Sequence, residues 1–249
     1  MRISRIGIAL ALSYAILSGC DKSPEPDKEF IDGINYYQGN GVSVDYNRAL
    51  ELFNISAEKN NPAAETALGD MYFYGHGVAR DYKISKEWYS KAAIQKFPPA
   101  QIRMVAFADG FEEKIKILLP LAEQGNSDAQ YQLGALYQNA GTTAGTASQQ
   151  YFDRAIKWFR TAAKKDSYAL ISLALMYQNG WGVRGDKAAA YALLKTAETA
   201  GYRDAANLVL DSLKEKMNPM EIEDGINLEK RMAEGDALEV LDQYLANHQ

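Results

Sequence analysis

Few residues in this 249-residue chain have side chains suited to catalysis or metal binding. There are two histidines, His76 and His248, and one cysteine, Cys20. A metal site needs clustered ligands, and a hydrolase needs an activated nucleophile. Carboxylates do lie side by side, as at Glu112 and Glu113, but in stretches typical of solvated helix faces. We therefore predict no catalytic residue, no metal site and no cofactor, and expect that the chain is not an enzyme.

Cys20 follows a segment with the features of a secretory signal. Arg2 and Arg5 precede the apolar run Ile6–Leu17, which is shorter than the roughly 20 residues that a membrane-spanning helix needs. The end of that segment, Leu17-Ser18-Gly19-Cys20, resembles the bacterial lipobox, where a peptidase cleaves directly before a lipid-modified cysteine. The resemblance implies a multiply acylated Cys20, because stable anchoring takes more than one acyl chain. A buried, unmodified cysteine is the alternative, and a disulfide within the chain would need a second cysteine.

Cleavage before Cys20 would make the mature chain more acidic. The formal net charge is −5, and residues 1–19 contain two arginines and no other charged residue, so the mature charge is −5 − 2 = −7. An acidic surface is a poor partner for nucleic-acid phosphates or anionic lipid headgroups. We expect a lipid-anchored protein of the bacterial cell envelope that faces the periplasm. Asp21 resembles the signal for retention at the inner membrane, and the outer membrane is the alternative.

A glycine-rich pattern occurs three times in the mature chain. Its copies are Gly39-Asn40-Gly41-Val42-Ser43-Val44-Asp45, Gly75-His76-Gly77-Val78-Ala79-Arg80-Asp81 and Gly180-Trp181-Gly182-Val183-Arg184-Gly185-Asp186. We expect positive φ at Gly75 and Gly77, where the chain leaves a helix through a conformation that a side chain would penalise. His76 occupies a variable position of the pattern, so we interpret it as an exposed loop residue, with a ligand as the alternative.

A short turn before each new helix is the second landmark. It occurs at residues 61–64, 97–100, 126–129, 166–169 and 202–205, at successive spacings of 36, 29, 40 and 36 residues. Between the turns, apolar residues recur at helical spacing, as in Ala67, Met71 and Tyr74, so each helix has an apolar face. A single helix pair cannot bury both of its faces, and we predict that its stability depends on stacking against its neighbours.

These residues resemble Sel1-like repeats, relatives of tetratricopeptide repeats in which each unit is a pair of antiparallel helices. Further matches are Ala67-Leu68-Gly69 with Tyr72, Lys91-Ala92-Ala93, Leu133-Gly134 with Tyr137, and Trp158 with Ala162-Ala163. The resemblance implies an all-α fold, a right-handed α-solenoid over residues 29–205, with units at about 29–64, 65–100, 101–129, 130–169 and 170–205. Residues 20–28, rich in proline and charge, are expected to form a flexible tether before it.

Residues 206–249 are predicted to cap the solenoid. Asn218-Pro219-Met220-Glu221 has the form of a helix start, with an N-cap, a proline and an acidic residue in the first turn. We expect a helix from Pro219 to about Ala233 and a further short helix within residues 236–246. Such helices would cover the last open face of the repeats.

Two units depart from the standard length. The third lacks the glycine pattern, and the fourth has Gly141-Thr142-Thr143-Ala144-Gly145-Thr146-Ala147-Ser148 in its place, a composition suited to a flexible excursion. Drift in a tolerant surface loop is one interpretation. The other is that this loop and the shortened unit shape a partner site.

The expected function is protein binding through the inner face of the solenoid. Polar positions on the first helices of the central units include Gln101, Arg103, Gln130 and Gln132, and we hypothesise that they contact a protein partner. Lipoproteins with this architecture resemble the immunity partners of phospholipase toxins of the type VI secretion system, which implies that the chain binds and neutralises such a lipase. An envelope scaffold or regulator that holds a resident enzyme or sensor complex is the alternative. We expect no nucleic-acid partner, and a monomer, since a capped acidic solenoid needs no second copy to close its core.

Overall fold

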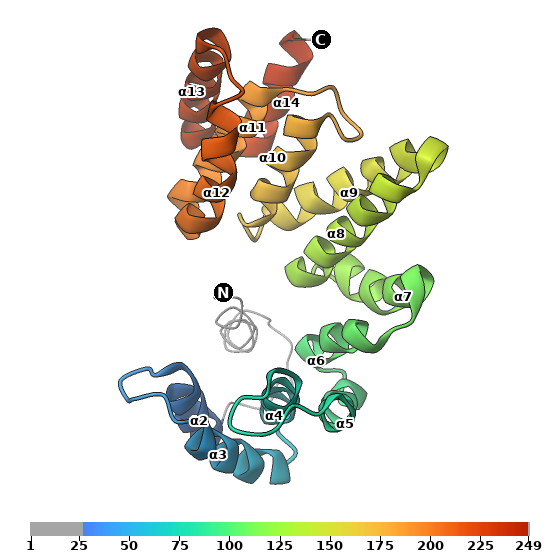
Figure 1. Ribbon diagram of the computed structural model, residues 1–249, viewed down its shortest axis with the longest axis vertical. Helices are drawn as coiled ribbons and strands as arrows, with labels where there is room; N and C mark the ends of the chain where they lie inside the picture. The colour runs from blue at the N-terminus through green and yellow to red at the C-terminus, as the bar shows by residue number, and fades with distance from the viewer. Residues whose placement is uncertain (1–26, 249) are drawn as a thin grey trace. The chain divides into compact units, whose positions relative to one another are not determined.

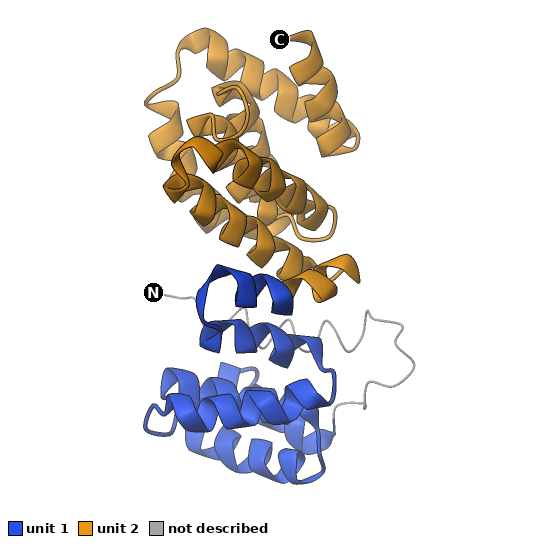
Figure 2. Ribbon diagram, turned by 90° about the vertical axis from the view of Figure 1, so that its right-hand side faces the viewer, with its two compact units in different colours: residues 1–117 blue, residues 118–249 orange. Residues whose placement is uncertain are grey.

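The computed structural model describes residues 27–248, and every regular element in that range is a helix (Figure 1). The chain divides into two compact units, one up to Ile117 and one from Leu118 onward (Figure 2). The predicted all-α fold is therefore confirmed. Within residues 27–248, no helix is both long enough and apolar enough to cross a membrane. The predicted signal segment, Cys20 and most of the predicted tether lie outside the described residues.

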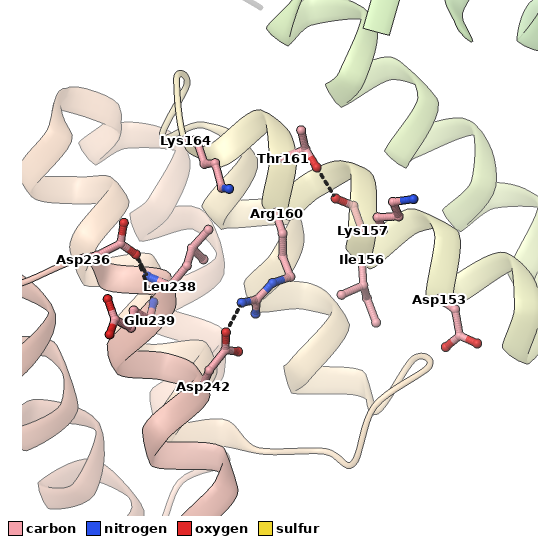
Figure 3. A pocket seen from close by; sticks show the side chains of 10 residues that line it. All are labelled: Asp153, Ile156, Lys157, Arg160, Thr161, Lys164, Asp236, Leu238, Glu239 and Asp242. Carbon is pink, nitrogen blue, oxygen red and sulfur yellow. Dashed lines mark hydrogen bonds and ion pairs between the residues drawn. The ribbon is translucent and has the colours of Figure 1, made fainter. Parts of the chain in front are cut away.

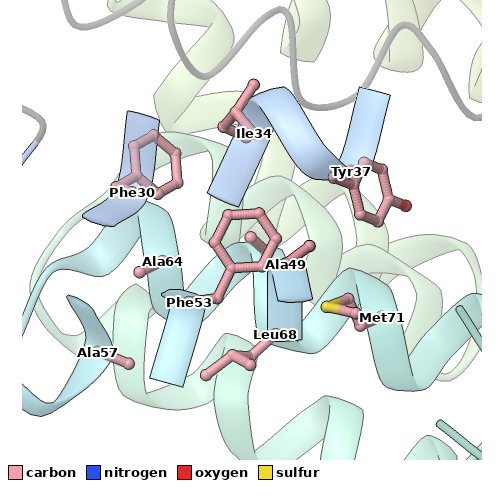
Figure 4. Close-up of a cluster of buried hydrophobic side chains, with 10 residues drawn as sticks. Phe30, Ile34, Tyr37, Ala49, Phe53, Ala57, Ala64, Leu68 and Met71 are labelled. Carbon is pink, nitrogen blue, oxygen red and sulfur yellow. The ribbon is translucent and has the colours of Figure 1, made fainter. Parts of the chain in front are cut away.

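The first unit is a series of helix pairs. In chain order its elements are α2 (Lys28–Gln38), α3 (Tyr46–Glu58), α4 (Pro62–Tyr74), α5 (Tyr82–Ile94), α6 (Pro98–Arg103), the 3-10 helix η2 (Met104–Phe107) and the start of α7 (Gly110–Glu123). α3 packs against both α2 and α4, and their buried side chains form one cluster (Figure 4). Phe53 of α3 is fully buried in this cluster, and burial of such a side chain contributes roughly 1.5–3 kcal/mol.

The glycine pattern ends one helix and begins the next. Each copy starts with a glycine in the left-handed conformation that terminates a helix: Gly39 after α2, Gly75 after α4 and Gly180 after α10 (Ala169–Asn179). Each copy ends with an aspartate that caps the following helix by accepting a backbone N–H of its first turn: Asp45, Asp81 and Asp186. The expected positive φ is confirmed, at 75° for Gly75 and 71° for Gly77.

A glycine inside the first helix of a pair lets an aromatic ring of the second helix approach closely. A Cβ at Gly69 of α4 would lie 2.5 Å from the ring of Tyr89 in α5. Gly33 of α2 has the same relation to Phe53, at 2.6 Å. Glycine lowers helix stability by up to about 1 kcal/mol relative to alanine. Close ring packing therefore compensates for a weaker helix at these positions.

The second unit continues the helix pairs and adds further helices. Its elements are the end of α7, α8 (Ser127–Thr143), the 3-10 helix η3 (Gly145–Ala147), α9 (Ser148–Ala163), α10, α11 (Lys187–Ala197), the π-helical turn η4 (Glu198–Tyr202), α12 (Arg203–Lys214), α13 (Pro219–Glu234) and α14 (Ala237–Asn247). The expected helix start at Asn218 is confirmed, because its Oδ1 accepts from the N–H of Glu221 at 3.0 Å while Glu221 Oε2 accepts from the N–H of Asn218 at 2.8 Å. α13 packs on α11, where a Cβ at Gly225 would lie 2.8 Å from the ring of Tyr191.

The segment from Gly141 to Ser148 is not the flexible excursion that its composition predicts. α8 continues through Thr143, η3 follows, and α9 begins at Ser148. Ala140 stands where Gly75 and Gly180 end α4 and α10, so the helix is not stopped there. Gly141 is buried, and a Cβ there would lie 2.5 Å from the ring of Phe152. The glycine serves close packing between α8 and α9.

The predicted turns are confirmed as the places where helices begin. Each turn contains the first residue of a helix: Pro62, Pro98, Ser127, Ala169 and Arg203. In the shortened third unit the first helix, α6, has only six residues and is followed directly by η2. The chain then becomes extended at Ala108 before α7 begins at Gly110.

Candidate protein-binding surface

Aromatic side chains of the first unit form a connected group of rings. We call this group the aromatic surface and define it by its six residues: Tyr46, Phe73, Tyr74, His76, Tyr82 and Phe107. The ring centre of Phe73 lies 5.0 Å from that of Tyr74, 5.3 Å from that of Tyr82 and 6.1 Å from that of Phe107, with edge-on geometry in each case. Tyr74 is 39% exposed and Tyr82 is 51% exposed. These two tyrosines therefore present large rings to solvent from a packed aromatic base.

His76 connects the two helix pairs through this surface. Its ring stacks on Tyr46 at 4.8 Å and on Tyr74 at 5.7 Å, and its Nδ1 lies 2.7 Å from the hydroxyl of Tyr37. Burial lowers the pKa of His76, and the negative charge of Asp70 opposes that shift. The interpretation of His76 as an exposed loop residue is therefore wrong. The glycines on either side fold the loop back, so the imidazole packs between tyrosines.

Asp70 and Arg103 form an ion pair beside the rings. Arg103 Nε donates to Asp70 Oδ1 at 2.9 Å, and the Tyr89 hydroxyl donates to the same oxygen at 2.6 Å. The Asp70 side chain is 4% exposed and that of Arg103 is 24% exposed. Burial by itself would lower the pKa of Arg103, but the neighbouring carboxylate of Asp70 raises it above its usual value. Burial, reinforced by Asp70, also raises the pKa of Tyr89.

This part of the chain is basic although the whole chain is acidic. Residues 69–107 contain six lysines and arginines, two aspartates and one glutamate, which gives 6 − 3 = +3 against −5 for the full sequence, although Lys91 of this range is paired with Glu65 at 2.8 Å. Lys86 lies 5.9 Å from the ring centre of Phe107. Arg80 donates to the Tyr82 hydroxyl at 3.5 Å. The aromatic surface therefore has a positive border.

The four predicted partner-binding residues fall in both units. Gln101 and Arg103 are half-buried on α6 in the first unit, whereas Gln130 and Gln132 lie on α8 in the second. Gln130 does not point outward as expected, because its side chain is buried and Nε2 donates to the carbonyl of Ala122 at 2.9 Å. It satisfies a backbone group near the end of α7. Gln132 is half-buried and donates to Asp128 at 3.1 Å. A partner contact of any of these residues stays a prediction.

The aromatic surface was not predicted from the sequence. Tyr74 was expected on the apolar face of its helix, yet it is 39% exposed. A residue-by-residue comparison of the repeats could have indicated the aromatic surface. Phe73, Tyr74 and Tyr82 take the positions that Gln178, Asn179 and Lys187 take in the later repeat. Of these positions only that of Tyr74 is polar in both sister repeats, with Gln38 in the first and Asn179 in the later one, so Tyr74 is the residue that the comparison marks as not required for packing.

The second unit has a polar pocket of about 620 Å³ between α9 and α14 (Figure 3). Arg160 of α9 and Asp242 of α14 form an ion pair across it at 2.5 Å. Lys157 and Lys164 line the α9 side, and Asp236 and Glu239 line the α14 side. Apart from Asp153 the charged residues of the α9 side are basic and those of the α14 side are acidic, so the two sides attract each other and the pocket offers no single charge to a ligand. Among residues 27–248, no group of three or more His, Cys, Asp or Glu residues is arranged to hold a metal ion.

Successive helix pairs with short connections define the class of α-helical repeat proteins, which bind other proteins through surfaces rather than through enclosed sites. The Sel1 repeat model matches residues 32–61, 62–97, 127–167 and 167–202. These ranges cover more than half of the chain, which therefore belongs to the Sel1 repeat family. The unmatched residues 98–126 coincide with the shortened third unit. The family and the fold make the chain a protein-binding repeat protein.

Solved structures show the same fold. The chain is similar to a Sel1 repeat protein from Oxalobacter formigenes, with 26% identity, a TM-score of 0.61, and coverage of 91% of this chain and 98% of that one. It is similar in fold to the immunity protein Pa5087 from Pseudomonas aeruginosa, with 18% identity, a TM-score of 0.54, and coverage of 74% of this chain and 71% of that one. No curated protein has a significantly matching sequence.

Proposed function

We propose that this protein is an envelope lipoprotein that binds and neutralises a secreted phospholipase toxin, and that the aromatic surface is where the toxin docks. The observation behind this proposal is the exposure of Tyr74 and Tyr82 on a packed group of rings bordered by basic side chains. Tyrosine and arginine are enriched in the buried centres of protein interfaces, and a partner that covers the exposed parts of these rings would remove further apolar area from water.

Two further observations support a toxin as the partner. The immunity protein Pa5087 from Pseudomonas aeruginosa has this fold, although at 18% identity the likeness reaches the fold alone. The lipobox-like residues ending at Cys20 would hold the protein at a membrane, which is where a phospholipase meets its substrate. A binder that covers the lipase there would protect the cell without any catalytic group of its own.

The test first asks whether a phospholipase gene lies beside the gene for this protein, and then measures inhibition of that lipase by the chain. We expect the wild-type chain to abolish lipase activity at equimolar ratio. Because large exposed rings act as anchors, Tyr74→Ala and Tyr82→Ala are expected to weaken binding by roughly tenfold or more each. Leu208→Ala is the matched control, since Leu208 is 82% exposed but lies in the second unit.

Two outcomes would contradict the proposal. If the lipase kept full activity with a molar excess of the chain, the immunity function would be wrong, and recovery of a resident envelope enzyme or sensor on the same surface would favour a scaffold. If the lipase were inhibited equally by Tyr74→Ala, Tyr82→Ala and Leu208→Ala, the toxin would dock elsewhere.

A further inference from the structure

We propose that Arg103 binds a carboxylate of the protein partner, an aspartate or glutamate side chain that enters beside the aromatic surface. The inference rests on the proposed function in one respect only, that a protein docks on this surface. It adds the chemistry of the contact, and it does not depend on the partner being a lipase.

The guanidinium of Arg103 has donors that the first unit leaves unused. A guanidinium carries five N–H donors, and here only Nε is engaged, with Asp70 at 2.9 Å. The two terminal nitrogens have no hydrogen-bond acceptor among residues 27–248. The side chain is 24% exposed, and neither terminal nitrogen is among the buried side-chain atoms that lack a partner, so both keep contact with solvent and are accessible to a ligand. Two parallel N–H groups match the two oxygens of a carboxylate, which is the preferred partner of arginine in such geometry.

Arg103 is also held in position before a partner arrives. The Asp70 oxygen that accepts from its Nε also accepts from Tyr89, and the carboxylate is 4% exposed. Asp70 is therefore fixed by its surroundings and in turn fixes the orientation of the guanidinium. A pre-organised donor loses little side-chain entropy on binding, so more of the interaction energy appears as affinity.

The charges around Arg103 favour an anionic group over a cationic one. Lys86 lies 5.9 Å from the ring centre of Phe107, Arg80 donates to the hydroxyl of Tyr82, and both rings pack on Phe73. A partner lysine or arginine placed here would meet like charge, which is unfavourable at an interface. The recessed position of Arg103 suits one projecting side chain better than a flat bilayer of lipid headgroups.

A titration with small carboxylates tests this site without the partner. The probe is 3-phenylpropionate, which joins a carboxylate to an aromatic ring, and the matched control probe is the uncharged 3-phenylpropanamide. The protein is the mature chain with Cys20→Ser, and the readout is the NMR signal of the Arg103 Nε–Hε group. Since hydrogen bonds between charged groups are about twice as strong as neutral ones, we expect saturable shifts with the carboxylate and at least roughly fivefold weaker binding of the amide.

Variants separate charge from folding. Arg103→Gln leaves Asp70 unpaired, so the double variant Asp70→Asn/Arg103→Gln is the reference, because it removes both charges and keeps a hydrogen-bond acceptor for Tyr89. We expect this variant to fold and to lose the preference for the carboxylate, observed on backbone amides of α6. Arg103→Lys is expected to retain a weaker preference, as an ammonium keeps the charge without the fork of donors.

Three results would overturn the inference. Equal affinity for carboxylate and amide would show apolar docking alone, and a carboxylate preference that persists in the double variant would place the anion elsewhere. Arg103-dependent binding to vesicles of phosphatidylglycerol, with no carboxylate binding, would assign the site to lipid. A chain that binds 3-phenylpropionate through Arg103 but inhibits no lipase would keep this inference and refute the proposed function, so the two fail separately.

Discussion

Asp70 shows how one buried side chain can organise a binding surface. Its carboxylate holds Arg103 and Tyr89 through a single oxygen while it is 4% exposed. A buried charge that loses its partner costs more than an exposed ion pair contributes. The pair therefore links the stability of the first unit to the position of the Arg103 guanidinium.

Replacement of this carboxylate should lower stability. Asp70→Asn keeps an acceptor for Tyr89 but leaves the half-buried guanidinium without its counter-charge, and we expect the free energy of unfolding to fall by about 1–3 kcal/mol. Urea unfolding followed by circular dichroism measures the change. Asp109→Asn is the control, because Asp109 is an exposed carboxylate of the same unit. Equal effects of the two substitutions would show that the ion pair contributes nothing specific.

His76 predicts a pH dependence of stability. Burial lowers its pKa below the ordinary value of 6.5, so the folded chain favours the neutral imidazole. The stability contribution is fully present above pH 6.5 and is lost as the pH falls through the pKa of the folded state, because the unfolded chain protonates first. Asn40 occupies the equivalent position of the first repeat, which makes His76→Asn the matched variant.

We expect the unfolding free energy of the wild type to fall more than that of His76→Asn between pH 7.5 and pH 5.5. Unfolding in urea at both pH values gives the comparison. If the two proteins lost stability in parallel, protonation of His76 would not be coupled to folding.

At the scale of the helices, the fit between a glycine and an aromatic ring fixes how the two members of a pair approach. A Cβ at Gly134 of α8 would lie 2.6 Å from the ring of Phe159 in α9. Alanine usually stabilises a helix relative to glycine by up to about 1 kcal/mol. For Gly134→Ala we expect the opposite sign, a loss of about 1–3 kcal/mol from overpacking.

Thermal unfolding of Gly134→Ala measures this loss of stability. In the double variant Gly134→Ala/Phe159→Leu the smaller leucine side chain leaves room for the methyl group, so part of the lost stability should be recovered. Gly185→Ala provides the control, since the nearest heavy atom to a Cβ there is 3.7 Å away. A Gly134→Ala protein as stable as the wild type would mean that α9 shifts to accept the methyl group without cost.

The start of α13 gives a second prediction at this scale. Asn218 and Glu221 satisfy each other's backbone N–H groups, so Asn218→Ala should destabilise the chain by about 1 kcal/mol. Asn227→Ala tests the same change of residue type on the exposed middle of α13, where alanine is the better helix former. Chemical denaturation distinguishes the two, and similar effects would argue against a role for the cap.

At the scale of the whole molecule, the fold could be predicted because the glycine pattern and the helix starts recur along the sequence. Gly75 and Asp81 each have a backbone role that only a few residue types fulfil, so their recurrence identified the helix ends. Where the pattern is absent, composition misled, since Gly141 serves ring packing in a helix and not a loop. The candidate site was harder to predict from the sequence than the fold. Arg103 was named as a contact residue, but its ion pair with Asp70 joins residues that are 33 positions apart. No local sequence pattern contains such a contact.

Membrane attachment is a prediction for the chain as a whole. With a single cysteine, the chain has one candidate for acylation, so Cys20→Ser should move the protein from the membrane fraction to the soluble periplasmic fraction and abolish incorporation of labelled palmitate. Cell fractionation and labelling measure both effects. Ser18→Ala is a control that leaves the cysteine in place. Continued membrane association of Cys20→Ser would mean that another part of the chain anchors it.

The contacts between glycines and rings have a consequence for how such proteins diversify. Gly33 meets Phe53, Gly69 meets Tyr89 and Gly134 meets Phe159, and each contact joins the two helices of one pair. The two residues of a contact are thus inherited together when a gene segment encoding one pair is copied or lost. Duplication or deletion of a pair then preserves these three fits, and the length of the array can change over evolution while each hairpin keeps its internal geometry.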